Sequence, residues 1–283
     1  FYKHRFLRIL PPFVFFAVLY CLLPLAWGGM TWEQSVADLK NLPLNFPSMA
    51  GHLWFMYPLI SLYLIMPVIS PWLEKASAKD ELIFLGIFAF STFMPWLHKF
   101  VAPELWGECF WNCYHMLWYC SGFIGFLVMA HFVRFHIRWT VKKRLTVGTV
   151  CFLAGAGFTA WSFWWKGVPG VLIDTPILEW AWEFCTPNVL CATFGLFLIF
   201  TCIGANKSCK LITGISKLSF GIYLMHMFFL APIAAFFVNG NQANPIVPVY
   251  LAIPCIALLT FVCCTITAKL LSYVPGSRWF LGA

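Results

Sequence analysis

A stripe of polar side chains runs along an apolar segment near the end of the chain. Ser216, Ser219, Tyr223 and His226 share one helical face, at positions i, i+3, i+7 and i+10. Ionisable groups within membrane spans usually face the bundle interior or a water-filled cavity, and histidine accepts a proton near neutral pH. The stripe therefore indicates a candidate proton-transfer site. Hydrogen bonds that hold neighbouring helices together would explain it equally well.

A second histidine stands where another apolar segment begins. His52 opens the run His-Leu-Trp-Phe-Met-Tyr and shares a helical stripe with Met56 and Tyr63. Placed at a membrane interface, its imidazole could take the proton of a reacting hydroxyl. The alternative is an aromatic interfacial belt in which His52 is anchored beside Trp54 and Tyr57.

The chain begins with a basic segment. Arg5 and Arg8 lie three residues apart, on one face of a helix, directly before an apolar run. Two guanidinium groups placed in this way suit bidentate binding of phosphates. Ordinary positive charges that flank a membrane span on its cytoplasmic side are the alternative explanation.

Composition fixes the kind of element that must position these residues. Of 283 residues, 61% are hydrophobic and 10% are charged, whereas soluble domains carry about 25% charged residues. Apolar runs approach or exceed the roughly 20 residues that cross a bilayer as a helix. We predict an all-α, polytopic transmembrane helical bundle that forms one membrane-embedded domain over residues 1–283. Its eight spans are predicted at residues 11–27, 52–73, 82–97, 111–132, 145–164, 189–204, 215–238 and 247–271.

The loop charges predict the orientation of these spans. With the N-terminus inside, only Lys40, Lys99 and Lys166 of the 18 Lys and Arg residues lie on the outer side. The positive-inside rule favours this arrangement, in which both termini are cytoplasmic. The net charge of +8 then indicates contact with anionic membrane lipids rather than with nucleic acid.

The 12 cysteines do not suggest a metal site. Most of them lie inside apolar runs, where cysteine behaves as a small hydrophobic residue. Cys109, Cys113 and Cys185 fall in loops predicted outside, and a disulfide among them is left open. Since no Cys/His spacing is typical of a zinc site, we predict no metal.

Taken in order along the chain, the three polar segments resemble the acyltransferase-3 family of bacterial integral-membrane O-acyltransferases. The first family motif is matched by Phe1, Arg5 and Arg8, and the second by His52, Trp54, Tyr63, Leu64 and Pro67. The third is matched by Ser219, Gly221, Tyr223 and His226. The resemblance extends over nearly the whole chain.

The resemblance implies acyl transfer across the bacterial cytoplasmic (inner) membrane. Acetyl-CoA would bind from the cytoplasm as the acyl donor, and the acceptor would be a hydroxyl of a surface glycan or lipid-linked saccharide. Arg5 and Arg8 would bind the CoA phosphates. His52, Tyr223 and His226 are the expected catalytic residues, and Trp54, Tyr63 and Ser219 the expected substrate-binding residues.

The chain departs from the family pattern at its beginning. Family members usually have ten spans, and the first of them carries a basic residue followed eleven positions later by a histidine thought to be catalytic. The sequence starts where the third family span would start, so we expect the first two helices to be missing and the chain alone to be inactive.

Two other functions stay open at the level of sequence. A transporter or flippase could move a lipid-linked sugar or an acyl donor without forming a bond, with the arginines and histidines lining its path. A non-catalytic relative could act as a partner within a polysaccharide assembly complex. The acceptor sugar, the acyl chain length and the oligomeric state, a homo-oligomer included, are not determined by the sequence.

Overall fold

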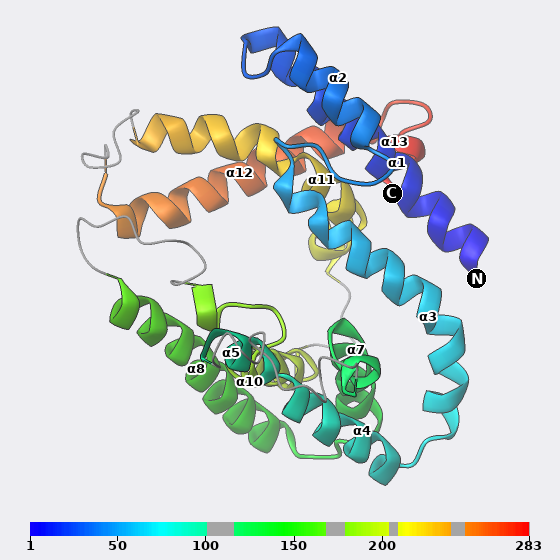
Figure 1. Cartoon of the computed structure of the whole chain (residues 1–283). Helices are drawn as coiled ribbons and strands as arrows, with labels where there is room; N and C mark the ends of the chain where they lie inside the picture. Colours follow the sequence, from blue (N-terminus) through cyan, green and yellow to red (C-terminus); the bar gives the residue numbers. More distant parts are fainter. Residues whose placement is uncertain (101–115, 168–178, 204–208, 239–246, 283) are drawn as a thin grey trace. The chain divides into compact units, whose positions relative to one another are not determined.

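The computed structural model describes residues 1–100, 116–167, 179–203, 209–238 and 247–282. All regular elements in these ranges are helices (Figure 1), which confirms the predicted all-α class. The chain divides into two compact units. Unit 1 comprises Phe1–Leu64 and Ser208–Ala283, and unit 2 comprises Ile65–Lys207. The predicted single domain stays a prediction.

Unit 1 gathers helices from both ends of the chain. It contains α1 (Tyr2–Leu22), η1 (Leu23–Trp27), α2 (Trp32–Asn41), η2 (Gly51–Phe55), the first part of α3 (Met56–Lys75), α11 (Lys210–Val238), α12 (Val249–Leu271) and α13 (Arg278–Leu281). Unit 2 contains the rest of α3, α4 (Ala78–Ser91), α5 (Met94–Phe100), η4 (Trp118–Cys120), α7 (Phe123–Phe135), α8 (Val141–Lys166), η5 (Glu179–Ala181) and α10 (Pro187–Phe200).

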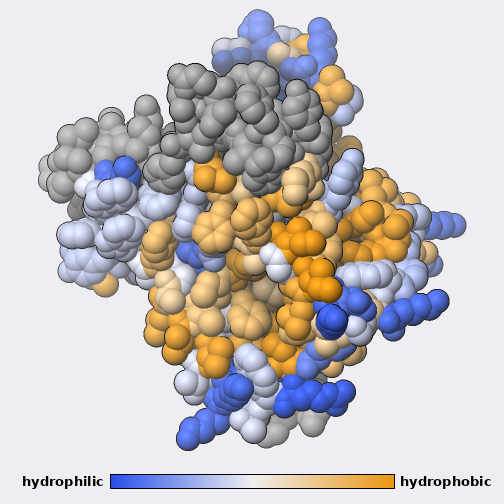
Figure 2. Space-filling model, turned by 60° about the horizontal axis from the view of Figure 1, so that its bottom comes forward, coloured by the Kyte–Doolittle hydropathy of each residue, from blue (hydrophilic) through white to orange (hydrophobic). Residues whose placement is uncertain are grey.

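Six helical stretches in the described ranges are long and apolar enough to cross a membrane. They are Tyr2–Trp27, Gly51–Lys75, Ala78–Leu97, Val141–Lys166, Lys210–Phe237 and Val249–Leu271, and two shorter apolar helices are Phe123–Phe135 and Pro187–Phe200. Each predicted span overlaps one of these eight, although residues 111–115 of the fourth span lie outside the described part. Figure 2 shows a face on which hydrophobic residues predominate, as a lipid-facing surface requires. The number of spans and the sides of the termini stay predictions.

The segment between the first two predicted spans, residues 28–51, contains a helix of its own. Helix α2 begins with a capping box, in which the Thr31 side chain accepts from the Gln34 backbone and the Gln34 side chain accepts from Thr31. The fully buried Ser35 hydroxyl donates to the Cys21 carbonyl at 2.7 Å. This bond holds α2 against the end of α1.

The short C-terminal helix α13 is fixed in the core of unit 1. Leu281 is fully buried and packs against Gly221 of α11, where an added Cβ would lie 2.8 Å from the Leu281 side chain. Gly282 follows with φ +68°, a left-handed conformation that favours glycine. Figure 1 shows α13 beside α1, so the two ends of the chain meet in one unit.

Unit 2 contains a helix pair in very close contact. An added Cβ at Gly148 of α8 would lie 2.8 Å from the Gly195 carbonyl oxygen of α10, and one at Gly155 would lie 2.7 Å from the Ala192 backbone nitrogen. Small residues that allow two backbones to approach are typical of membrane helix interfaces. The Asn188 amide adds a hydrogen bond of 2.7 Å to the Thr159 hydroxyl across this pair.

The predicted outer cysteines are only partly described. Cys185 is a free thiol. Cys109 and Cys113 lie outside the described residues, as do Glu104, Glu108 and Asp174 of the predicted outer loops.

Candidate active site

The three residues expected to be catalytic come together in unit 1. The rings of His52 and His226 meet edge to face, with their centroids 4.7 Å apart. The Tyr223 ring centroid is 5.7 Å from that of His52, and the Tyr20 ring lies on the same imidazole at 5.2 Å. Helices α1 and α11 and the short helix η2 thus supply one histidine–tyrosine cluster, made of Tyr20, His52, Tyr223 and His226.

Hydrogen bonds to backbone carbonyls fix three of the four cluster side chains. His226 Nδ1 lies 2.6 Å from the Tyr223 carbonyl oxygen. Because a carbonyl only accepts, Nδ1 carries the proton, and Nε2 of the neutral ring keeps its lone pair. The Tyr223 hydroxyl donates to the His52 carbonyl, and the Tyr20 hydroxyl donates to the Leu224 carbonyl at 3.0 Å. The two tyrosine bonds connect α1 and η2 to α11, and the third bond orients the His226 imidazole.

The His52 imidazole differs from the other members of the cluster. Both of its ring nitrogens are buried, and apart from a weak contact with the Leu224 backbone neither has a hydrogen-bond partner within the described ranges. A buried polar group without a partner costs about 1–3 kcal/mol. The His52 ring is therefore prepared to bind a polar group of another molecule, such as a hydroxyl or a carbonyl oxygen.

A cationic cleft of about 660 Å³ lies at the N-terminal end of α1. Its lining residues are His4, Leu7, Arg8, Lys217, Arg278, Trp279 and Gly282. The Arg8 Nε donates to the Gly282 carbonyl at 2.8 Å, which orients the guanidinium from α1 by means of the C-terminal segment. Three cationic side chains from α1, α11 and α13 thus surround one cleft, an arrangement suited to a polyanion such as a phosphate ester.

The sequence predicted only one of these three cations. Lys217 and Arg278 were counted among the inner-side charges, and no spacing connects Arg8 with Arg278 across almost the whole chain. A second cleft of about 650 Å³ shares Lys217 and adds Lys210 and Lys269. Five of the basic residues predicted on the inner side therefore line these two cavities of unit 1.

Arg5 does not line the cationic cleft. Its guanidinium carbon lies 5.6 Å from the Tyr63 ring centroid and 5.7 Å from that of Phe1, within the range of cation–π contacts. The predicted arginine pair is thus divided between two environments, although both residues are on α1. Tyr63, which was expected to bind substrate, makes a cation–π contact with Arg5.

Of the other two expected substrate-binding residues, Trp54 lies near the cluster and Ser219 is exposed on α11. The exposed Ser219 hydroxyl donates to the Ser216 carbonyl of its own helix at 2.8 Å. Trp54 packs edge-on against Phe55 with ring centroids 5.9 Å apart, and Phe55 lies 5.8 Å from the Tyr223 ring. Trp54 is therefore connected to the cluster through one aromatic neighbour. Substrate binding by Trp54, Tyr63 and Ser219 stays a prediction.

An apolar groove of about 530 Å³ adjoins the histidine–tyrosine cluster. It is lined by Tyr20, Pro24, Trp27, Met49, Met227, Phe228, Ala231, Pro232 and Ala235. Tyr20 belongs to both features, and its ring stacks on Phe228 with centroids 4.1 Å apart. The groove can hold an apolar chain or the face of a sugar next to the imidazoles.

The histidine–tyrosine cluster lies further along the same two helices, α1 and α11, than the cationic cleft does. On α1, Arg8 and Tyr20 are 12 residues apart, about 18 Å at 1.5 Å per residue. On α11, Lys217 and His226 are separated by about 14 Å on the same basis. A ligand that used both features would need an anionic end and a long, narrow arm.

The long apolar helices are those of a multi-pass membrane protein. The family model of the acyltransferase-3 domain, described as an acyltransferase domain, matches residues 1–269. The chain therefore belongs to this acyltransferase family, which confirms the resemblance in the sequence and indicates a membrane acyltransferase. No curated protein and no solved structure shows significant similarity to the chain.

Proposed function

We propose that this protein transfers an acetyl group from acetyl-CoA to a hydroxyl of a surface or lipid-linked glycan at the bacterial inner membrane. The observation that carries the proposal is the placement of a cationic cleft and a histidine–tyrosine cluster on the same two helices, α1 and α11. Coenzyme A has the matching form, since its phosphates are at one end and its thioester is at the end of an extended pantetheine arm.

The donor's phosphates would occupy the cationic cleft. Arg8, with its Nε held by Gly282, keeps its terminal N–H groups for phosphate oxygens, and Lys217 and Arg278 add charge from two other helices. Charge-assisted hydrogen bonds of this kind are roughly twice as strong as neutral ones. The predicted orientation puts this end on the cytoplasmic side, where acetyl-CoA is made.

His226 is the proposed general base. Its Nε2 lone pair would take the proton of the acceptor hydroxyl while the hydroxyl oxygen attacks the thioester carbonyl carbon. The tetrahedral intermediate would then expel the CoA sulfur, which takes the proton back from His226. The products are an O-acetyl ester and CoA with a free thiol, and no metal takes part.

His52 and Tyr223 would assist this step in different ways. The negative charge that develops on the thioester oxygen needs a preorganised donor, and His52 has a ring N–H without a partner in the described part of the chain. Tyr223 donates to the His52 carbonyl, so we assign it a positioning role. The apolar groove beside Tyr20 suits the lipid chain or a sugar face of the acceptor.

Titration calorimetry with acetyl-CoA tests the donor site. We expect Arg8→Ala, Lys217→Ala and Arg278→Ala each to weaken binding by about 10-fold or more, because a hydrogen bond to a charged group contributes about 1.5–3 kcal/mol. The matched control is Arg138→Ala, an exposed arginine of unit 2. The same titration of Arg5→Ala determines whether Arg5, which contacts Tyr63, also contributes to acetyl-CoA binding.

Titration with a second ligand separates the contribution of the phosphate contacts from that of the contacts to the pantetheine arm. S-acetylpantetheine lacks the nucleotide phosphates, so its weaker binding should be unchanged by Arg8→Ala. Equal losses of acetyl-CoA affinity in Arg138→Ala and Arg8→Ala, or no loss in any of the three cleft variants, would contradict the proposed donor site.

A further inference from the structure

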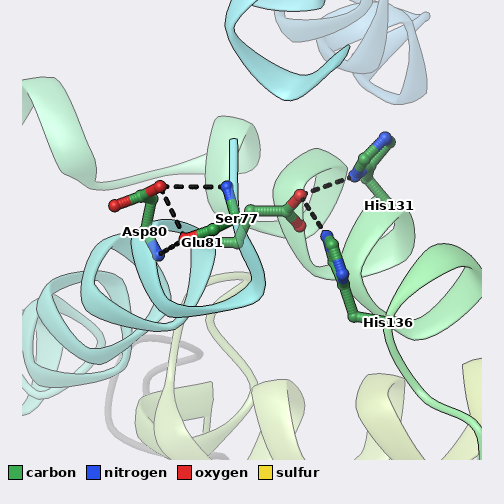
Figure 3. A network of polar contacts seen from close by, with 5 residues as sticks. All are labelled: Ser77, Asp80, Glu81, His131 and His136. Carbon is green, nitrogen blue, oxygen red and sulfur yellow. Dashed lines mark hydrogen bonds and ion pairs between the residues drawn. The ribbon is translucent and has the colours of Figure 1, made fainter. Parts of the chain in front are cut away.

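Unit 2 contains a compact cluster of one carboxylate and two imidazoles. Glu81 Oε1 lies 2.9 Å from His131 Nδ1 and 2.9 Å from His136 Nε2. The three ligand atoms, one from each residue, all lie within 4.8 Å of one another. Figure 3 shows the Glu81 carboxylate pointing between the two rings. The Glu81 side chain is fully buried, whereas His131 and His136 are 22% and 24% exposed.

The local structure explains why these three residues meet. Helix α4 begins with a capping box in which Ser77 and Asp80 bond to each other. The Asp80 side chain is thereby held at the start of its own helix. Glu81, the next residue, points to His131 and His136 (Figure 3). On a continuous helix His131 and His136 would be about 140° apart. Helix α7 ends at Phe135, so His136 can turn back toward Glu81.

The buried carboxylate of Glu81 is only partly compensated. Its Oε1 is paired with both imidazoles, but its Oε2 is buried and has no hydrogen-bond partner within the described residues. A buried charge is stable only when it is paired and its remaining lone pairs are satisfied. Glu81 Oε2 lacks a partner, and the carboxylate that carries it points at two imidazoles. This arrangement indicates that a cation is the missing partner.

We propose that Glu81, His131 and His136 bind one Zn²⁺ ion. Two imidazoles and one carboxylate form a ligand set that zinc uses with water in the fourth position. Bonds of about 2.0–2.1 Å in a tetrahedral site place ligand atoms about 3.4 Å apart, so the observed 2.9 Å pairs need to open only slightly. The partial exposure of both histidines provides a path for the ion. Bound zinc would connect α4 to α7 and does not enter the acyl transfer proposed for unit 1.

This inference departs from the sequence-based expectation of no metal site. That expectation rested on Cys/His spacing, and here the ligands are not close in sequence. Glu81 is 50 residues from His131 and 55 from His136. The five-residue interval between the histidines matches no zinc pattern for a continuous helix, and only the end of α7 makes it suitable.

Zinc content measured on untagged, chelator-treated protein after titration with zinc chloride tests the proposal. We expect one tightly bound zinc per chain in the wild type. Glu81→Gln and His131→Gln should lose the tightly bound zinc. Loss of a residue that only supports a metal ligand lowers metal affinity by roughly 10–100-fold, and we expect a larger loss here because a ligand itself is removed. Asp80→Asn is the matched control: it removes a carboxylate from the adjacent position, and it should bind zinc as the wild type does.

Substitution by Co²⁺ in the wild type keeps the test independent of how well the variants fold. The expected result is the absorption of four-coordinate Co²⁺, together with nitrogen couplings from two imidazoles. Zinc should also raise the melting temperature of the wild type and Asp80→Asn, but not of folded His131→Gln, because an ion that binds only the native state stabilises it. Absence of wild-type binding, a spectrum of Co²⁺ coordinated only by water, or unchanged binding in folded His131→Gln would overturn the proposal.

Discussion

The two units of this protein place their histidines in opposite surroundings. In unit 1, both ring nitrogens of His52 are buried beside aromatic rings and lack a partner in the described part of the chain. In unit 2, His131 and His136 both contact the buried carboxylate of Glu81. An imidazole that lacks a partner is prepared for a substrate, whereas imidazoles held by a carboxylate are prepared to hold structure or an ion.

The two units also differ in how closely their helices pack. The core of unit 1 is built from large side chains of several helices, with a cationic cleft and an apolar groove beside them. In unit 2, helices α8 and α10 meet backbone to backbone at Gly148, Gly155 and Gly195. We infer that unit 1 provides open space for ligands and that this helix pair of unit 2 provides a rigid support.

The largest predicted effect on stability comes from disrupting the close contact between α8 and α10 in unit 2. Gly155→Ala puts a methyl group 2.7 Å from the backbone nitrogen of Ala192, and a backbone cannot yield as a side chain can. We expect a loss of about 2–3 kcal/mol of unfolding free energy, the upper range for overpacking. Denaturant unfolding in mixed micelles, followed by circular dichroism, measures it.

Two alanine substitutions serve as controls for this comparison. Gly157→Ala is on the same helix and has no atom within 4 Å of the added Cβ, so it should be neutral or stabilising by up to about 1 kcal/mol. Gly221→Ala in unit 1 meets the Leu281 side chain, which can shift, so its cost should be smaller than that of Gly155→Ala. Equal costs at Gly155 and Gly157 would contradict the description of the α8–α10 contact.

A smaller difference is expected between the alkylation rates of one thiol in each unit, Cys185 and Cys209. Burial raises the pKa of the Cys185 thiol in unit 2 to about 11. At pH 8 its thiolate fraction is then roughly 100-fold lower than for a thiol with the ordinary pKa of 9.0. We expect alkylation of Cys185 to be slow at pH 8 and to accelerate as the pH rises toward 11. Cys209 in unit 1 is exposed and serves as the reference in peptide mass spectrometry.

Fast alkylation of Cys185 at pH 8, at the rate of Cys209, would show that this part of unit 2 is open to solvent. Resistance of Cys185 to alkylation in denaturant without reductant, followed by reaction after reduction, would instead reveal the disulfide that the sequence left open.

The helices and the histidine–tyrosine cluster could be predicted from sequence for two different reasons. Long apolar runs leave few alternatives to membrane helices, because each backbone polar group must be satisfied within its own segment. His52, Tyr223 and His226 were found through the family motifs, since 171 residues separate Tyr223 from the His52 carbonyl that it contacts. The helical stripe from Ser219 to His226 was predicted, but the Ser219 hydroxyl bonds within its own helix.

The features that were missed depend on contacts between distant parts of the chain. Arg8 is oriented by Gly282, 274 residues away, and Arg278 reaches the cleft from a helix too short to predict from periodicity. Glu81 meets His136 only because α7 ends one residue earlier. Helix α2 did carry a local signal, the Thr31–Gln34 capping box, although we predicted no helix between the first two spans.

Transfer of radiolabel from [acetyl-¹⁴C]CoA to glycan, in membranes that contain the full protein and the cell's own lipid-linked saccharides, tests the central claim most directly. We expect covalent label in glycan with the wild type and transfer lowered by about 10²–10⁴-fold in His226→Gln, the range for loss of a general base. His226→Gln should still bind acetyl-CoA, whereas Arg8→Ala should lose affinity for it. Wild-type protein that binds or moves the donor without covalent label, or His226→Gln that transfers at the wild-type rate, would contradict the account.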